Sequence, residues 1–466
     1  MLPQEQEQEQ ELCPERQNPC HDYALSRNDD MPVLLIGIDD TDSKYGMCTT
    51  YIAVLLVKTL SKYGKVALPI LMRLNPTIPY KTRGNGAVAL IVSTEKEKEV
   101  KELVLQTVAE NAELKAEGTE PGVVFVRCHE LRSYAERRLA RFSAAAVRHV
   151  LSVENAEKTL AKLPAECSAF KKKGRGLIGA LAATGFFFLG CCGDERLLDK
   201  TYELIAYRHE ERWGTPRDID DASVFLADRL TYPLTWDTVD QSLRRVICAP
   251  HSPCPILFGI RGDDVAAIRK AYEVIRSEPV KMAQLFVTNQ GTDAHLIEAK
   301  ISDVENYHSY ILKGVVSRDP IVTKGGHVFF SLSDFDGTAA IDCAAYEPTK
   351  GFRSVVRKLR VGDVIAAYGS VKNYTLNLEK IEVLKLKTHV VKKNPKCDIC
   401  GRTMESAGMN KGYRCVACKT YAASPMLAVE RRDIDEGFYE VTPSARRHLS
   451  KPLIRFPSKI KVHPSR

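Results

Sequence analysis

The sequence predicts a multidomain protein of α/β and α+β class that ends in a small β-barrel and a four-cysteine domain. Three observations support this prediction. An unbroken apolar run over 33–38 leads into an acidic loop and then a helical pattern, as in α/β units. Five short strand-like segments follow one another from about residue 306, and two Cys-x-x-Cys pairs come after them. A chain of 466 residues is long enough for roughly three or four domains.

The N-terminal segment over residues 1–30 differs from the rest of the chain. It carries two basic and eight acidic side chains and has no apolar period, so we expect a disordered extension without activity. The sequence contains no long apolar run and no secretory signal, which predicts a cytoplasmic protein that does not contact a membrane. The fourteen cysteines are scattered through a long chain, which favours free thiols and metal ligands over a disulfide framework.

The first folded element predicted is a strand over 33–38, which is apolar without alternation and therefore buried on both faces. It ends in three carboxylates within four residues, Asp39, Asp40 and Asp42. Ligands of open sheets bind beyond the carboxyl ends of the strands, and Mg²⁺ prefers carboxylate and phosphate oxygens. Carboxylates this close repel one another unless they share a cation. We interpret them as a Mg²⁺ site on a polyphosphate, and an acidic capping turn is the alternative.

A helix is expected to follow the acidic loop, beginning at Thr49 or Thr50 and ending at Gly64. The elements predicted after it are strands at 66–71, 87–92 and 123–126, and helical segments at 96–114 and 127–163. This order predicts a region in which helices alternate with strands of one sheet.

A basic, glycine-rich loop precedes the next helical pattern. Its candidate phosphate contacts are Lys171, Gly174, Arg175 and Gly176. Glycine lets the backbone approach a ligand closely, and a helix N-terminus attracts an anion, so the loop predicts a phosphate-binding site. It is not a Walker motif, because no Gly-Lys-Ser/Thr closes it. A solvated basic turn is the alternative.

A second acidic cluster contains Asp218 and Asp220 and precedes another helical pattern. These carboxylates can pair with a cationic substrate or complete the metal site, and a helix cap explains at least one of them equally well. A strand at 256–260 and a helix at 265–276 then predict an α+β domain. The polar stretch over 286–295, which contains Asp293, is expected to line a cleft, because unpaired polar groups are costly to bury.

The pattern of predicted secondary structure changes at about residue 306. The five strand-like segments are 310–321, 327–333, 338–346, 364–371 and 375–386. A short helix over 352–359 falls between the third and fourth, which is the plan of an OB-fold barrel, often used on single-stranded nucleic acid. Its aromatic residues, Phe335 and Tyr374 among them, can stack on bases or fill the barrel core.

Two Cys-x-x-Cys pairs near the C-terminus give the most specific local pattern. Cys397 with Cys400 and Cys415 with Cys418 set four thiolates on two tight turns, which together close a tetrahedral Zn²⁺ site. Because sulfur fills all four positions, the metal is expected to be structural. Residues 391–466 carry sixteen Lys or Arg against seven Asp or Glu, an excess of positive charge that is typical of a nucleic-acid-binding segment.

Taken together, these motifs resemble those of one family. They are Ile-Gly-Ile-Asp-Asp-Thr-Asp with Gly-Met-Cys-Thr-Thr, Gly-Arg-Gly-Leu-Ile-Gly-Ala, Asn-Gln-Gly-Thr-Asp-Ala-His-Leu, the barrel and the four cysteines. From Met31 to about Lys461 the chain resembles the archaeal 2-agmatinylcytidine synthetases of tRNA(Ile). The resemblance implies a catalytic region over 31–300, with an ATP-binding kinase-like domain and a ferredoxin-like domain. It also implies an OB-fold domain over 306–388, and a zinc ribbon with a basic tail over 392–461.

The resemblance also implies a function, that of an ATP-dependent tRNA-modifying ligase. Such an enzyme conjugates agmatine to C2 of the wobble cytidine in the anticodon region of an isoleucine tRNA, tRNA(Ile), so that the anticodon reads AUA. It phosphorylates the C2 oxygen, and ATP ends as AMP. The resemblance places Mg²⁺ at the acidic loop, ATP at the 171–176 loop, and the guanidinium of agmatine at Asp218, Asp220 and Asp293. Thr49 is implied as a phosphate acceptor, with a helix N-cap as the open alternative. No obligate protein partner is evident.

Two other functional classes fit part of the sequence. A non-catalytic OB-fold and zinc-ribbon protein that binds single-stranded nucleic acid accounts for the C-terminal domains but leaves the acidic and basic loops unexplained. A small-molecule kinase accounts for the acidic loop but gives the basic C-terminal domains no role. A lysidine-type synthetase is disfavoured, because its Ser-Gly-Gly-x-Asp-Ser loop does not occur.

Overall fold

A ten-stranded sheet organises the N-terminal two thirds of the protein, seen in a computed structural model that describes residues 31–81 and 84–466. The expected disordered extension over 1–30 lies outside the described residues. The strand order is β6-β5-β1-β4-β3-β12-β7-β11-β8, with β2 paired to β4. The strands are β1 (Val33–Asp39), β2 (Lys65–Val66), β3 (Ile70–Arg73), β4 (Gly86–Ser93), β5 (Gly122–Arg127), β6 (Ala165–Ala169), β7 (Thr201–Arg208), β8 (Thr235–Trp236), β11 (Ile256–Gly262) and β12 (Val280–Thr288).

Strand β1 lies inside this sheet and is buried on both faces, as its apolar run predicts. Leu35 packs into one hydrophobic core, whereas Leu34 and Ile36 pack into the other, on the opposite face. Both neighbours of β1, however, run antiparallel to it. The sheet is continuous across the two halves of the N-terminal region, residues 31–300, because β3 and β12 pair in parallel at Ile70 and Val287.

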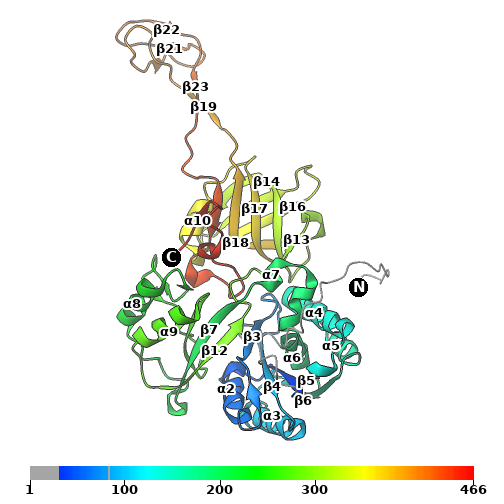
Figure 1. Cartoon of the computed structure of the whole chain (residues 1–466). Helices are drawn as coiled ribbons and strands as arrows, with labels where there is room; N and C mark the ends of the chain where they lie inside the picture. The colour runs from blue at the N-terminus through cyan, green and yellow to red at the C-terminus, as the bar shows by residue number, and fades with distance from the viewer. Residues whose placement is uncertain (1–30, 82–83) are drawn as a thin grey trace.

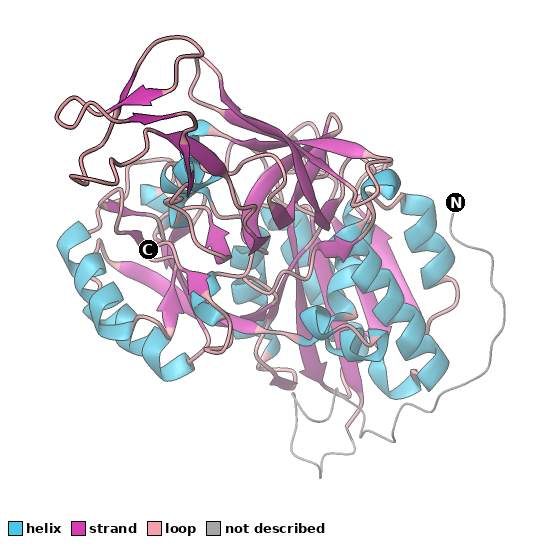
Figure 2. Ribbon diagram, turned by 90° about the horizontal axis from the view of Figure 1, so that it is seen from above, coloured by secondary structure: helices cyan, strands magenta, loops and turns pink. Residues whose placement is uncertain are grey.

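Helices pack on both faces of the sheet (Figure 1 and Figure 2). The helices of this region are α2 (Thr49–Leu60), α3 (Glu97–Asn111), α4 (Ser133–Arg148), α5 (Val153–Leu160), α6 (Gly176–Thr184), α7 (Glu195–Leu198), α8 (Asp221–Thr231) and α9 (Val265–Val274). The single helical segment predicted over 127–163 is wrong in one respect. The chain breaks after α4, and Ser152 caps a separate helix α5 through a reciprocal pair of bonds with Asn155.

Helix α6 lies directly against the backbone of the sheet. A Cβ atom on Gly37 of β1 would stand 1.9 Å from the carbonyl oxygen of Ala180, and one on Gly176 would stand 2.4 Å from the backbone nitrogen of Gly122. No side chain fits at these two glycines. The Gly-rich sequence before α6 therefore serves helix–sheet packing as well as any ligand.

The predicted OB-fold is confirmed. Its strands are β14 (Ser309–Val322), β15 (Val328–Ser333), β16 (Ala340–Ala345), β17 (Val364–Lys372) and β18 (Thr375–Lys385). The barrel closes because β17 pairs with both β14 and β18. In the sequence, α10 (Gly351–Val356) lies between β16 and β17, the third and fourth strands of the barrel. Of the aromatic residues, Phe330 is buried in the core, whereas Phe335 and Tyr374 are exposed.

The four-cysteine domain is inserted into the barrel's sheet and projects from it on a two-stranded stalk (Figure 1). Stalk and domain comprise β19 (Val390–Lys393), β20 (Glu405–Ser406), β21 (Tyr413–Arg414), β22 (Tyr421–Ala422) and β23 (Met426–Val429). The chain then returns, and β24 (Gly437–Glu440) pairs with β18 while β25 (Val462–His463) pairs with β24. The predicted unit over 392–461 is therefore two parts, and the tail belongs to the body of the protein.

Much of the positive charge in the tail is neutralised within the protein. Arg446 pairs with Asp237 and, at 2.9 Å, with Glu440, and all three side chains are buried. Arg455 lies 2.9 Å from Asp199. The tail therefore offers less positive charge to nucleic acid than its sequence suggests, because most of its cations have acidic partners within the protein. No helix in the described part of the chain has the length and apolarity to cross a membrane.

Candidate functional site

Two cavities adjoin each other in the N-terminal region, and only the second also reaches the barrel and the tail. The acidic cavity, of about 500 Å³, contains Asp39, Asp40 and Asp42. The basic cavity, of about 490 Å³, is lined by residues of the N-terminal region, the barrel and the tail. The residues common to both walls are Arg73, Leu74, Ile78, Lys81, Gly84 and Asn85. The two cavities therefore form one divided cleft.

The carboxylates of the acidic cavity are held in place by the backbone around them. Asp39 ends β1 and lies against α6, where a Cβ on Gly179 would stand 1.9 Å from its Oδ2. Asp40 has a φ of 57°, a left-handed conformation that Asp tolerates better than most residues, and its carboxylate accepts a hydrogen bond of 3.1 Å from the backbone N–H of Glu120. The predicted turn thus aims its acidic side chains into one cavity.

Electrostatics make this cavity a good place for a cation. Burial, with the nearby charge of Asp40, raises the pKa of Asp39 well above its usual value. Burial also raises the pKa of Asp40 to about 6, although the N–H of Glu120 and the charge of Arg175 oppose that rise. Two carboxylates that resist ionisation beside each other need a positive charge, and a divalent cation bound by oxygens supplies it. The donor set fits Mg²⁺, and the metal assignment stays a prediction.

Thr49 lines the acidic cavity but does not cap the helix. Cys48 occupies the N-cap position of α2, and Thr49 is the first helical residue. The hydroxyl of Thr41 donates to the hydroxyl of Thr49 at 3.0 Å. The N-cap alternative is therefore wrong, and the phosphate-accepting role remains a prediction that this location allows.

The predicted phosphate loop is only partly at the cavity. Arg175 lines it, lies over the ring of Tyr80 at 5.2 Å, and donates to the carbonyl of Gly118 at 3.0 Å. Lys171 is absent from the cavity wall, and its ammonium donates to the carbonyl of Ala116 at 2.9 Å. Gly174, at φ 61°, shapes the turn, and Gly176 packs on β5.

The three carboxylates predicted to meet a guanidinium do not line either cavity. Asp220 is the N-cap of α8 and pairs with Arg276 on the surface, so the capping alternative is confirmed for this residue. Asp218 is exposed. Asp293 is buried and lies 2.6 Å from the ammonium of Lys380, which is itself fully buried. The arrangement gives the guanidinium prediction no support.

The polar stretch after β12 was expected to line a cleft, and it is instead buried. Asn289 pairs with the backbone of Arg73 through bonds of 2.7 and 2.9 Å, and thereby fastens the end of β3 beside β12. His295 lies 3.0 Å from Glu379 of the barrel. Protein groups satisfy most of these polar atoms, so the stretch joins domains and does not face a ligand.

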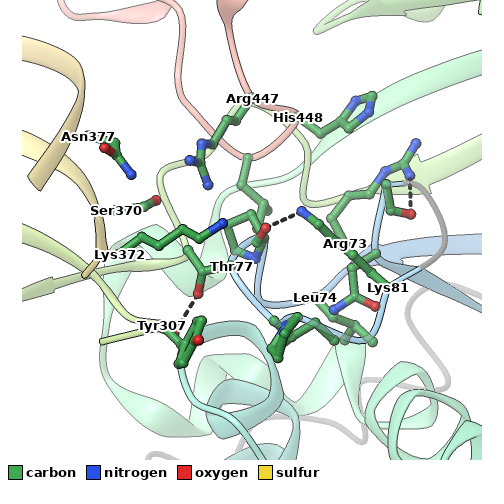
Figure 3. Close-up of a pocket in the computed structure, with 16 residues that line it drawn as sticks. Arg73, Leu74, Thr77, Lys81, Tyr307, Ser370, Lys372, Asn377, Arg447 and His448 are labelled. Carbon is green, nitrogen blue, oxygen red and sulfur yellow. Dashed lines mark hydrogen bonds between the residues drawn. The ribbon is translucent and has the colours of Figure 1, made fainter. Parts of the chain in front are cut away.

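The basic cavity was not predicted from the sequence. Figure 3 shows Lys372 and Arg447 on one side of it and Arg73 with Lys81 on the other, and no carboxylate of the described residues lines it. These four cations come from a strand end, a loop, the barrel and the tail, so no local pattern groups them. Their convergence is a feature of the fold alone, and it suits a polyanion such as a nucleic-acid backbone.

The four cysteines of the ribbon come together as predicted. Their Sγ atoms all lie within 4.8 Å of one another, and those of Cys400 and Cys415 are 3.6 Å apart. Tetrahedral Zn²⁺ with Zn–S bonds of about 2.3 Å separates its sulfurs by roughly 3.8 Å, so this set fits the ion. Four protein ligands leave no open position for a substrate, which indicates a structural metal.

Models of known families match the chain along most of its length. Those described as the TiaS TCKD domain and the TiaS FLD domain match residues 35–172 and 174–295. The OB-fold nucleic acid binding domain matches 310–384, and the TiaS C-terminal zinc ribbon domain matches 394–434. TiaS of Methanosarcina mazei, named as a 2-agmatinylcytidine synthetase of tRNA(Ile), is 49% identical over 426 residues, 91% of this chain and 97% of that protein.

The chain belongs to the TiaS family. A namesake from Archaeoglobus fulgidus is 49% identical over 425 residues, 90% of this chain and 97% of that protein. The crystal structure of apo TiaS matches with a TM-score of 0.84 at 46% identity and covers 93% of this chain and 100% of its own. That of TiaS in complex with its isoleucine tRNA, AMPCPP and agmatine matches with a TM-score of 0.80 at 44% identity, with the same coverage. The predicted resemblance and the predicted fold class are thus confirmed.

Proposed function

We propose that this TiaS-family chain is a ligase that joins agmatine to C2 of the wobble cytidine of tRNA(Ile). The single observation that carries the proposal is the acidic cavity, in which the family's Asp-Asp-Thr-Asp motif gathers three carboxylates beside a threonine hydroxyl and an arginine. Named relatives that match about nine tenths of the chain, including one bound to its isoleucine tRNA, an ATP analogue and agmatine, support the substrates. A protein that only binds nucleic acid has no use for this cavity.

The chemistry requires that a carbonyl oxygen become a leaving group. We propose that ATP gives up two phosphoryl groups and ends as AMP: one goes to the C2 oxygen of the base, and the other goes to the hydroxyl of Thr49 or to water. The amine of agmatine then attacks C2. The C2–N bond forms, and the C2–O bond breaks as the oxygen departs with its phosphoryl group. Asp39, Asp40 and Asp42 would hold Mg²⁺, which supplies charge neutralisation on the triphosphate when bound. Arg175 lines the same cavity and would add a positive charge near those phosphates.

The barrel, the ribbon and the basic cavity would bind the tRNA. The exposed Phe335 and Tyr374 are available for stacking, and Lys372 places a cation of the barrel at the cleft. The target base must leave its stack to reach the acidic cavity, and contacts to the backbone on either side hold it there. The protein would act in the cytoplasm, where its tRNA resides.

One assay tests this function. The protein is incubated with a tRNA(Ile) transcript that carries the wobble cytidine, ATP and labelled agmatine, the nucleotide products are separated, and the label is located by nuclease digestion. We expect label at the wobble position and release of AMP, both dependent on all three substrates. Asp40→Ala should abolish labelling and leave tRNA binding largely intact, with the exposed Asp303→Ala as the matched control. ADP release without labelling would favour a kinase, and tRNA binding without nucleotide turnover would favour a binding protein.

A further inference from the structure

Two histidines from different domains form a hydrogen-bonded pair at the acidic cavity. His149 follows the last residue of α4 and lines the cavity. His308 precedes the first barrel strand, and its Nε2 lies 3.0 Å from Nδ1 of His149, with the ring centroids 5.0 Å apart. The Nδ1 atom of His308 lies 3.0 Å from the carbonyl oxygen of Asn306. None of the roles derived above uses this pair.

The carbonyl of Asn306 fixes where the protons lie. A carbonyl only accepts, so Nδ1 of His308 carries a proton and donates it. In neutral His308 the other nitrogen, Nε2, is then an acceptor, and Nδ1 of His149 donates to it. The Nε2 atom of His149 is left with a lone pair. Among the described residues that atom has no hydrogen-bond partner, and the ring is exposed at the cavity.

The charges around His149 favour its neutral form. Burial, the neighbouring His308 ring and the charge of Arg148 lower the pKa of His149, while Glu305 acts weakly in the opposite direction. Arg148 is itself fixed, because its Nε donates to the carbonyl of Ala294 at 2.9 Å and its guanidinium pairs with Asp194. The lone pair on Nε2 is therefore available near neutral pH.

The proposed reaction needs a proton acceptor that the carboxylates cannot supply. An alkyl amine has a pKa of about 10, so at neutral pH it is an ammonium ion that must lose a proton before its nitrogen can attack C2. Carboxylates that coordinate a metal are poor acceptors for that proton. The wall next to His149 is formed by Val150, Leu151 and Val153, apolar side chains that suit the methylene chain of a diamine-like substrate.

We propose that His149 is a further catalytic residue, whose Nε2 accepts the proton released by the attacking primary amine, and that His308 is the residue that positions it. The inference rests on the proposed function and adds an acceptor to it. At neutral pH the amine is an ammonium ion with two protons to lose. One passes to Nε2 of His149, which frees the lone pair that bonds to C2. The other leaves with the phosphorylated oxygen as the C2–O bond breaks. The barrel, which supplies His308, is thereby part of the catalytic apparatus.

Single-turnover label transfer across a pH range tests the assignment, with saturating ATP, tRNA(Ile) transcript and agmatine. His149→Ala should slow transfer by about 10²–10³-fold at pH 7.5, with an unchanged Kd for tRNA. The wild-type rate should level off above the pKa of His149, whereas the variant rate should keep rising toward the pKa of the amine. Added imidazole should restore part of the variant's rate. His308→Ala should slow transfer less than His149→Ala does. It should also shift the midpoint of the pH–rate profile from its wild-type position.

The exposed His129, which follows β5 in the same domain, provides the matched control His129→Ala, and His149→Gln replaces His149→Ala if the alanine variant does not fold. Wild-type rates and profile in His149→Ala would overturn the proposal and would leave the ligase function standing. Equal losses in tRNA affinity and in rate would overturn it too, because His149 would then be an RNA contact. Failure of the wild-type protein to label tRNA would instead refute the proposed function.

Discussion

Asp40→Asn should stabilise this protein and inactivate it at the same time. The Asp40 carboxylate is largely buried, and its pKa is raised to about 6, mainly by burial. Its usual value of 3.8 implies a difference of about two units, which corresponds to about 3 kcal/mol of destabilisation when the group is ionised. Asparagine removes the charge, tolerates the φ of 57°, and can still accept from the N–H of Glu120.

The sign of the pH dependence follows from the raised pKa. Below about pH 4 the wild-type carboxyl is protonated in the folded and unfolded states alike, so the variant has no advantage. Between about pH 4 and pH 6 the folded state binds the proton more tightly than the unfolded state, so wild-type stability falls as the pH rises. Above about pH 6 the full difference in the free energy of unfolding between the variant and the wild type is present. The variant's gain should therefore appear on raising the pH from 4 to 7.

Denaturant unfolding in metal-free buffer at pH 4.5 and pH 7.5 measures this effect. We expect Asp40→Asn to unfold at a higher denaturant concentration at pH 7.5, by up to about 3 kcal/mol, and to show much less gain at pH 4.5. Mg²⁺ should stabilise the wild type more than the variant. Asp218→Asn, at an exposed carboxylate, should change neither measurement. A variant less stable than the wild type at pH 7.5, or a gain at pH 4.5 as large as the gain at pH 7.5, would refute the reasoning.

Three further predictions concern other parts of the structure. Gly179→Ala should displace the Asp39 carboxylate and reduce labelling strongly, because the new Cβ would meet Oδ2 at 1.9 Å; kinetics and a crystal structure check this. Asp293→Asn should leave Lys380 buried without its counter-charge and lower the free energy of unfolding by about 3–5 kcal/mol, with an unchanged KM for agmatine. Cys400→Ser, or zinc removal, should unfold the ribbon alone and weaken tRNA binding, as limited proteolysis and binding titrations would show.

Each of these has its own contrary outcome. Gly351→Ala is the control for Gly179→Ala, because a Cβ on Gly351 would meet open space. If Gly179→Ala is as active as this control, α6 adapts to the extra methyl group and the prediction is wrong. A raised KM for agmatine with normal stability in Asp293→Asn would restore that carboxylate as a substrate contact. Loss of the whole fold on zinc removal would show that the stalk does not isolate the ribbon.

The sequence predicts best those features that are encoded by neighbouring residues. The acidic turn after β1 and the cysteine pairs depend on short spacings in the sequence. The barrel is predictable because its five strands follow one another along the chain. The interpretation of Thr49 as an N-cap failed by one residue, because any of several residues near a helix start can take that position and Cys48 does so here through its extended backbone.

Features that depend on distant residues were missed. The sequence predicts that Asp293 is a free carboxylate, because its ion-pair partner Lys380 lies 87 residues away. Lys372 and Arg447 look like ordinary surface cations, and only the packing of the barrel and the tail on the N-terminal region brings them together with Lys81 around one cavity. The insertion of the ribbon within the barrel's sheet could not be predicted either, because a four-residue strand such as β24 is too short to show a clear hydrophobic period.

The location of the metal decides whether this description of the active site is right. Crystals of the protein with ATP and Mn²⁺, which substitutes for Mg²⁺ and gives an anomalous signal, would show it. We predict a peak about 2.2 Å from oxygens of Asp39, Asp40 and Asp42, bridged to the phosphates of the nucleotide. A triphosphate and a manganese peak bound elsewhere, with these three side chains free of metal, would contradict it.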